Sequence, residues 1–112
     1  MRIMLKAAIP VEHGNREVLQ GTLATTMKSI LDDMKPEAAY FVAENGKRTG
    51  IFFVNIQDAS EIPRIAEPLF LAFGAHVECT PAMIAQDLAA ASPAIEKAAK
   101  KYGGAAQSAG AR

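Results

Sequence analysis

His76 has the clearest capacity for acid–base chemistry in this sequence, because an imidazole titrates near neutral pH. The expected strand pattern places it on one face of a sheet with Lys6, Glu78 and Asn55. If that face lines a cavity, His76 can act as a general base on a small acidic carbon or hydroxyl, oriented by Glu78 or assisted by Lys6. In the alternative interpretation, Lys6 and Glu78 form a cross-strand ion pair and His76 lies at the rim of a dimer.

The same face carries an apolar group that can form the wall of a ligand pocket. Its predicted members are Met4, Tyr40, Ile51 and Phe53, with Asn55 placed to fix the polar edge of a flat apolar ligand. The alternative is an aromatic dimer core. The two interpretations are compatible, because a cavity between paired sheets lies inside such a core.

The residue pattern gives little support for a cysteine nucleophile, a metal site or a nucleotide-binding site. Cys79 is expected on the opposite face from His76, so it has no base beside it and is interpreted as a small buried apolar residue. His13, His76 and Cys79 lack the spacing of metal ligands. The chain has no phosphate loop, dinucleotide fingerprint or Gly-x-Ser-x-Gly motif. We therefore expect no metal and no cofactor.

The central hairpin organises the chain. Asn45-Gly46, the strongest short hairpin signal, separates two runs rich in aromatic and β-branched residues within 38–56. A two-residue loop pairs Glu44 with Lys47 and Tyr40 with Ile51. Both faces of this ribbon are then apolar, so both need a cover. Residues 2–9 and 75–80 alternate with period two and are predicted as the other strands.

Three helical segments surround these strands. An apolar stripe predicts one long helix from about residue 12 or 15 to Met34, passing through Gly21. A second helix begins with Ser60 as its cap and runs to Gly74, with a kink or a break at Pro68. A third runs from about Ile84 to Tyr102, is interrupted at Ser92-Pro93 and ends at Gly103-Gly104. We predict one domain over 1–103 and a disordered tail over 104–112.

The order strand, helix, strand, strand, helix, strand predicts an α+β fold of the ferredoxin-like βαββαβ type. Right-handed crossovers place two helices on one face of a four-stranded antiparallel sheet, and the C-terminal helix is extra. The second sheet face, which carries Met4, Lys6, Tyr40, Ile51, Phe53, Asn55, His76 and Glu78, is too apolar to remain in water. Its cover is a second copy of the sheet, the third helix or a ligand; we favour a homodimer.

Composition limits the function classes. The 112 residues include 12 basic and 12 acidic side chains, and this balance argues against binding to nucleic acid or to a membrane surface. The single Cys79 cannot form an intrachain disulfide, and the N-terminal apolar run is cut by Lys6 and Pro10. We expect a soluble cytoplasmic protein.

The element order, the length and the segment Phe73 to Met83 resemble the dimeric α+β-barrel superfamily. That group contains muconolactone-isomerase-like enzymes, antibiotic-biosynthesis-type cofactor-free monooxygenases and uncharacterised bacterial families, and the chain is most similar to one of the last. The resemblance covers about residues 1–90. It implies a dimer with a cavity between sheet and helices or between two sheets, and it assigns no catalytic residue.

Two function classes follow. The favoured hypothesis is a homodimeric ligand-binding or assembly module with an apolar cavity at the sheet face. The alternative is a small-molecule enzyme, isomerase- or monooxygenase-like, that uses His76 as its acid or base. Whether the third helix covers its own sheet or that of a partner is left open.

Overall fold

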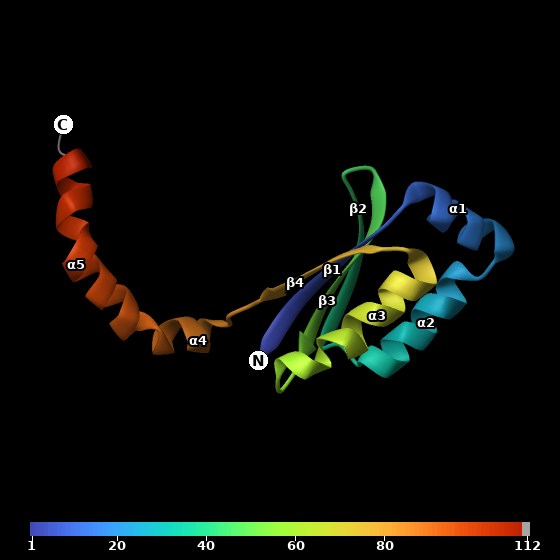
Figure 1. Cartoon of the computed structure of the whole chain (residues 1–112), viewed down its shortest axis with the longest axis horizontal. Helices are drawn as coiled ribbons and strands as arrows, with labels where there is room; N and C mark the ends of the chain where they lie inside the picture. Colours follow the sequence, from blue (N-terminus) through green and yellow to red (C-terminus); the bar gives the residue numbers. More distant parts are fainter. Residues whose placement is uncertain (111–112) are drawn as a thin grey trace. The chain divides into compact units, whose positions relative to one another are not determined.

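The computed structural model describes residues 1–110, with side chains through Gly104. The chain forms two compact units, Met1–Ala82 and Met83–Arg112 (Figure 1). The first unit contains, in order, β1 (Arg2–Ile9), α1 (Val11–Gln20), α2 (Leu23–Met34), β2 (Ala38–Glu44), β3 (Lys47–Asn55), a 3₁₀ turn (Ala59–Glu61), α3 (Ile62–Phe73) and β4 (His76–Pro81). The second contains α4 (Ala85–Ala90) and α5 (Ser92–Gly110).

The four strands form one antiparallel sheet in the order β2-β3-β1-β4. The hairpin has the predicted register, since Glu44 pairs with Lys47 and Tyr40 pairs with Ile51. Asn45 and Gly46 both have positive φ, 52° and 74°, as a two-residue turn of this kind requires. Strand alternation and turn chemistry are local properties, which explains why the pairing was predictable from the sequence.

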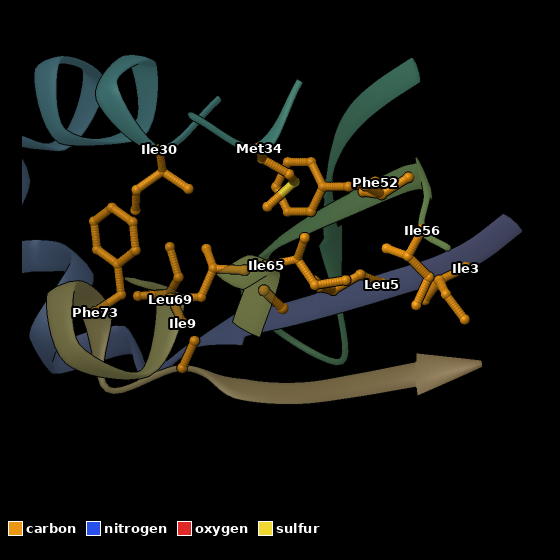
Figure 2. Packing of buried hydrophobic residues seen from close by; sticks show 13 residues of the cluster. Ile3, Leu5, Ile9, Ile30, Met34, Phe52, Ile56, Ile65, Leu69 and Phe73 are labelled. Atoms are coloured by element: carbon orange, nitrogen blue, oxygen red, sulfur yellow. The ribbon is translucent and has the colours of Figure 1, made fainter. Parts of the chain in front are cut away.

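The core lies between the sheet and the helix pair α2 and α3, which are side by side in Figure 1. Every second residue of β1 is buried, as the burial pattern of the strand shows. Figure 2 shows Met34 of α2 against Phe52 of β3, and Ile65 of α3 toward Leu5 of β1; Leu69 of α3 belongs to the same cluster. All five side chains are at most 2% exposed. The predicted division of the sheet into two faces is therefore confirmed.

The predicted long first helix is in fact two helices. Gly21 adopts the left-handed conformation (φ 74°), ends α1, and its N–H bonds back to the carbonyls of Glu17 and Val18. This conformation is accessible to glycine without steric cost. The chain changes direction there, and Val18 and Leu19 near the end of α1 are 47% and 86% exposed.

The second predicted helix has a different cap from the expected one, and Pro68 does not break it into two helices. Asp58, and not Ser60, is the cap: its carboxylate accepts a 2.9 Å hydrogen bond from the Ser60 N–H at the start of the 3₁₀ turn. Helix α3 is not divided at Pro68 and ends at Gly74. Pro68 lacks the N–H that would bond one turn back, and tertiary packing of Ile65 and Leu69 on either side of it outweighs this loss.

The C-terminal unit is helical in two pieces, and the predicted interruption near Ser92 is confirmed. Helix α5 continues to Gly110, so the prediction that Gly103-Gly104 ends it is wrong. Residues 111–112 of the expected tail lie outside the described part. Leu88, Ile95 and Tyr102 are more than half exposed. Within residues 1–110 no helix is both long and apolar enough to cross a membrane.

The architecture is thus α+β, with a four-stranded antiparallel sheet and five α-helices in the described chain. It is consistent with a ferredoxin-like fold. The helices of the first unit lie on one side of its sheet (Figure 1). We call the other side the open face; it carries Met4, Lys6, Ala8, Tyr40, Val42, Ile51, Phe53, His76 and Glu78.

Candidate functional site

Three of the predicted site residues meet in a pocket on the open face, near the hairpin turn. This His76 pocket has a volume of about 270 Å³ and is lined by Lys6, Ala8, Glu44, Asn45, Lys47, Thr49, His76 and Glu78. The sheet register assembles it, because Ala8 on β1 lies opposite both His76 on β4 and Thr49 on β3. Apart from Ala8, its lining residues have polar or charged side chains.

The charge pairing in the His76 pocket differs from the expected one. Lys6 Nζ lies 3.2 Å from the Glu44 carboxylate on β2, so the predicted Lys6–Glu78 pair is not formed. Glu78 Oε1 instead lies 3.3 Å from His76 Nε2. The long Lys6 side chain reaches across β3 to the turn, where Glu44 faces the same way as Tyr40 and Val42. The hairpin register placed Glu44 on this face, but sequence reasoning did not consider it.

His76 itself is accessible to solvent. Its side chain is 75% exposed and that of Glu78 is 58% exposed. A histidine held by one carboxylate in such a position can exchange protons with a molecule in the pocket. Thr49 is the buried polar residue of the wall, 3% exposed, and its hydroxyl donates to the Lys47 carbonyl oxygen.

Asn55 does not join His76. It pairs with Arg2 at one end of β1, whereas His76 pairs with Ala8 at the other. Six residues along a strand separate them by about 20 Å. The Asn55 side-chain oxygen accepts a 3.1 Å hydrogen bond from the N-terminal ammonium of Met1. Both residues face the same side, as predicted, but the prediction that they form one site is wrong.

The apolar members of the predicted site lie along the open face. Tyr40 is opposite Ile51 and Met4 is opposite Phe53. Tyr40 is 58% exposed and the other three are partly buried. They line neither the His76 pocket nor the groove described next. Together they form an apolar surface on the open face.

A larger hollow lies on the other side of the sheet, between α2 and the hairpin. This helix-side groove has a volume of about 600 Å³, and its lining is mainly apolar: Ile9, Leu23, Ala24, Met27, Lys28, Leu31, Phe41, Val42, Ala43, Arg48, Thr49 and Gly50. Phe41 lies on the helix side of the sheet, opposite Gly50, and is 56% exposed at the groove.

Small residues on the strands make room for the groove. Gly50 lies beneath the Phe52 ring, and a Cβ on Gly50 would stand 2.5 Å from the Phe52 Cζ atom. Phe41 packs edge-on against that ring, with 5.8 Å between centroids. Phe41, Ala43 and Gly50 therefore line the groove, and the buried Phe52 ring lies against Phe41 and Gly50. The path of α2 above them is a tertiary feature that the strand pattern does not encode.

The charged residues at the groove are both basic. Arg48 Nη1 donates to the Asn15 side-chain oxygen at 3.1 Å, and Lys28 forms an exposed ion pair with Asp32 one turn along α2, at 3.3 Å. No acidic residue lines the groove among the described residues. An apolar hollow with a cation at its rim suits a ligand that is apolar and anionic.

The remaining candidates have structural roles or none that the geometry supports. Cys79 packs against the core on the helix side, and its burial raises the pKa of its thiol. His13 Nε2 lies 2.9 Å from the Ala72 carbonyl oxygen and links α1 to α3. No three His, Cys, Asp or Glu side chains of the described chain are grouped as a metal site.

No protein-family model matches the chain, and no curated protein matches it significantly.

Proposed function

We propose that this protein is a homodimeric ligand-binding module, in which the helix-side groove holds a small apolar ligand and the open face joins two copies. The observation that carries the proposal is the groove of about 600 Å³ beside exposed Phe41. Ligand pockets are typically about 300–1,000 Å³, mainly apolar, with a few polar groups. The groove has these properties.

The homodimer rests on the open face. Tyr40, Ile51, Phe53 and Met4 form an apolar surface next to the charged His76 pocket. A surface of this kind favours a symmetric partner. The resemblance to dimeric α+β barrels supports the same arrangement, with two sheets packed face to face.

Ligand binding is tested by filling the groove. Ala43 is an exposed β2 residue that lines it, and a tryptophan is well tolerated on a strand surface. The test titrates the full chain with 1-decanol and with decanoate, followed by backbone NMR. We expect saturable shifts at Leu23, Met27 and Phe41, and their loss in Ala43→Trp but not in the matched control Thr80→Trp. If neither probe perturbs these residues, the groove is not a ligand site.

The dimer is tested by measuring mass in solution with light scattering. We expect twice the chain mass for the wild type and the mass of one chain for Phe53→Lys, which places a charge in the paired face. Leu19→Lys, on exposed α1, is the control and should leave the dimer intact. A wild-type mass of a single chain at high concentration would overturn the dimer.

A second candidate function is catalysis at the His76 pocket, favoured by the 3.3 Å contact between His76 Nε2 and Glu78 beside Lys6. In this hypothesis His76 removes a proton from a small substrate without metal or cofactor. Oxygen uptake or isomerisation is followed with a panel of dihydroxyaromatic compounds. If this pocket is catalytic, the wild type should turn over one of these compounds, and His76→Ala should lower the rate by about 10²-fold or more. Equal rates for both proteins would eliminate this candidate.

A further inference from the structure

We propose that the ligand of the helix-side groove is an apolar monocarboxylate and that Arg48 binds its carboxylate. This inference rests on the proposed ligand-binding function and adds the chemical class of the ligand. Its evidence is the combination of an apolar hollow with one positioned guanidinium that has no acidic partner among the described residues.

The position of Arg48 is set by its surroundings. On β3 it lies opposite Ile9 of β1 and Ala43 of β2, both of which line the groove. Its side chain extends over α1, where Nη1 donates to Asn15 at 3.1 Å. The absence of a side chain at Gly14 allows this approach, because a Cβ there would be 2.7 Å from Nη1. Arg48 therefore lines the groove, and α1 fixes the position of its guanidinium.

The charge of Arg48 is not neutralised in the way that two other arginines are. Arg2 forms an ion pair with Glu37 at 2.8 Å, and Arg64 with Glu61 at 3.2 Å. The hydrogen-bond acceptor of Arg48 is the neutral amide of Asn15, and no carboxylate of the described chain lies within ion-pair distance of it. A guanidinium has five N–H donors and matches a carboxylate in two parallel hydrogen bonds. One bond to Asn15 leaves donors for a ligand.

The groove selects for one negative charge on an otherwise apolar molecule. Lys28, the second cation at the rim, already pairs with Asp32, so its charge offers less to a ligand than that of Arg48. The rest of the lining is mainly hydrocarbon from Leu23, Met27, Leu31 and Phe41. A polar or multiply charged ligand would lose hydration there without compensating hydrogen bonds.

The test compares decanoate with 1-decanol, which share an apolar chain and differ in charge. Affinities of the full-length protein are measured by titration calorimetry at low salt. We expect decanoate to bind more tightly than 1-decanol. Arg48→Gln should lower the affinity for decanoate about tenfold, as removal of a charged hydrogen bond does. The affinity for 1-decanol should change less than about twofold, since the apolar contacts remain.

Lys47→Gln is the matched control, because it removes the same charge from the neighbouring position, which lines the His76 pocket on the open face. It should leave both affinities unchanged. The wild type alone allows one more test. Added salt should weaken the binding of decanoate but not that of 1-decanol, since salt screens only the charged contact.

The outcomes separate this inference from the proposed function. If both probes bind the groove with equal affinity, or if Arg48→Gln and Lys47→Gln have equal effects on decanoate, the carboxylate assignment is wrong while the groove is still a ligand site. If neither probe binds, the proposed function fails and the assignment fails with it.

Discussion

The two faces of the sheet are built from the same strands and have different surroundings. On the helix side, Leu5, Phe52 and Val54 are at most 1% exposed. On the open face, Met4, Lys6, Ile51 and Phe53 are partly exposed, although they lie next to these buried residues in the sequence. Alternation along the strands divides the residues into two sets. Which of the two sets is buried then depends on which side of the sheet the crossover helices cover.

The two hollows show the same contrast. The His76 pocket on the open face is lined mainly by polar and charged side chains that pair with one another. The helix-side groove is lined mainly by hydrocarbon, and its charged residues are both basic. The proposed site for an apolar ligand therefore lies on the side of the sheet that contains the core, and the candidate acid–base site lies on the other side.

The largest effect that can test this contrast is on stability. We expect Phe52→Ala to lower the free energy of unfolding by about 3–5 kcal/mol, because it removes a fully buried ring and leaves a cavity. Phe53→Ala on the open face should cost less than about half as much when urea unfolding is measured at low protein concentration. Equal costs for the two variants would show that both faces are covered alike.

A methyl group at Gly50 should produce the next largest effect. Its Cβ would stand 2.5 Å from the Phe52 Cζ atom, so the ring must shift. Overpacking of this kind costs about 1–3 kcal/mol, which urea unfolding of Gly50→Ala would detect. The control is Gly104→Ala, where a Cβ meets no atom within 4 Å. An unchanged unfolding midpoint for Gly50→Ala would mean that the Phe52 ring is loosely packed against Gly50.

A smaller effect on stability, which depends on pH, is expected at Asp58, the cap of the 3₁₀ turn before α3. The Ser60 hydroxyl and then its backbone N–H lower the pKa of Asp58 below its ordinary value of 3.8. A depressed pKa in the folded state stabilises the fold above the unfolded value, and this contribution is lost as the pH falls through the folded value. Asp58→Ala should therefore destabilise the protein at pH 7. In unfolding titrations the difference from wild type should shrink steadily below pH 3.8; a difference independent of pH would contradict the role of the charge.

The smallest effect belongs to the ion pair on the open face. Lys6 and Glu44 are 3.2 Å apart with side chains 30% and 39% exposed, and solvent screens such pairs to at most about 1 kcal/mol. Lys6→Gln should change the free energy of unfolding by less than this amount, and added salt should reduce the change further. A cost above about 2 kcal/mol would indicate that the His76 pocket is shielded from water, as in a closed dimer.

Several local features were predictable from the sequence because neighbouring residues decide them. The register of the hairpin follows from Asn45-Gly46, and the two faces follow from alternation in β1 and β3. The candidate site was predicted only in part: Lys6, His76 and Glu78 meet, but Asn55 lies at the other end of the sheet. Facing the same side does not imply proximity, because strand position also matters.

The sequence by itself determined the strands, the hairpin turn, the helix-side core and the apolar character of the open face. These depend on period, turn chemistry and hydrophobicity, which are local. Only the tertiary structure decided that Gly21 divides the first helix, that Lys6 reaches Glu44, and that α2 leaves a groove over Phe41 and Gly50 with Arg48 at its rim. These depend on the path of one element across another, and that path is set by the packing of the whole core.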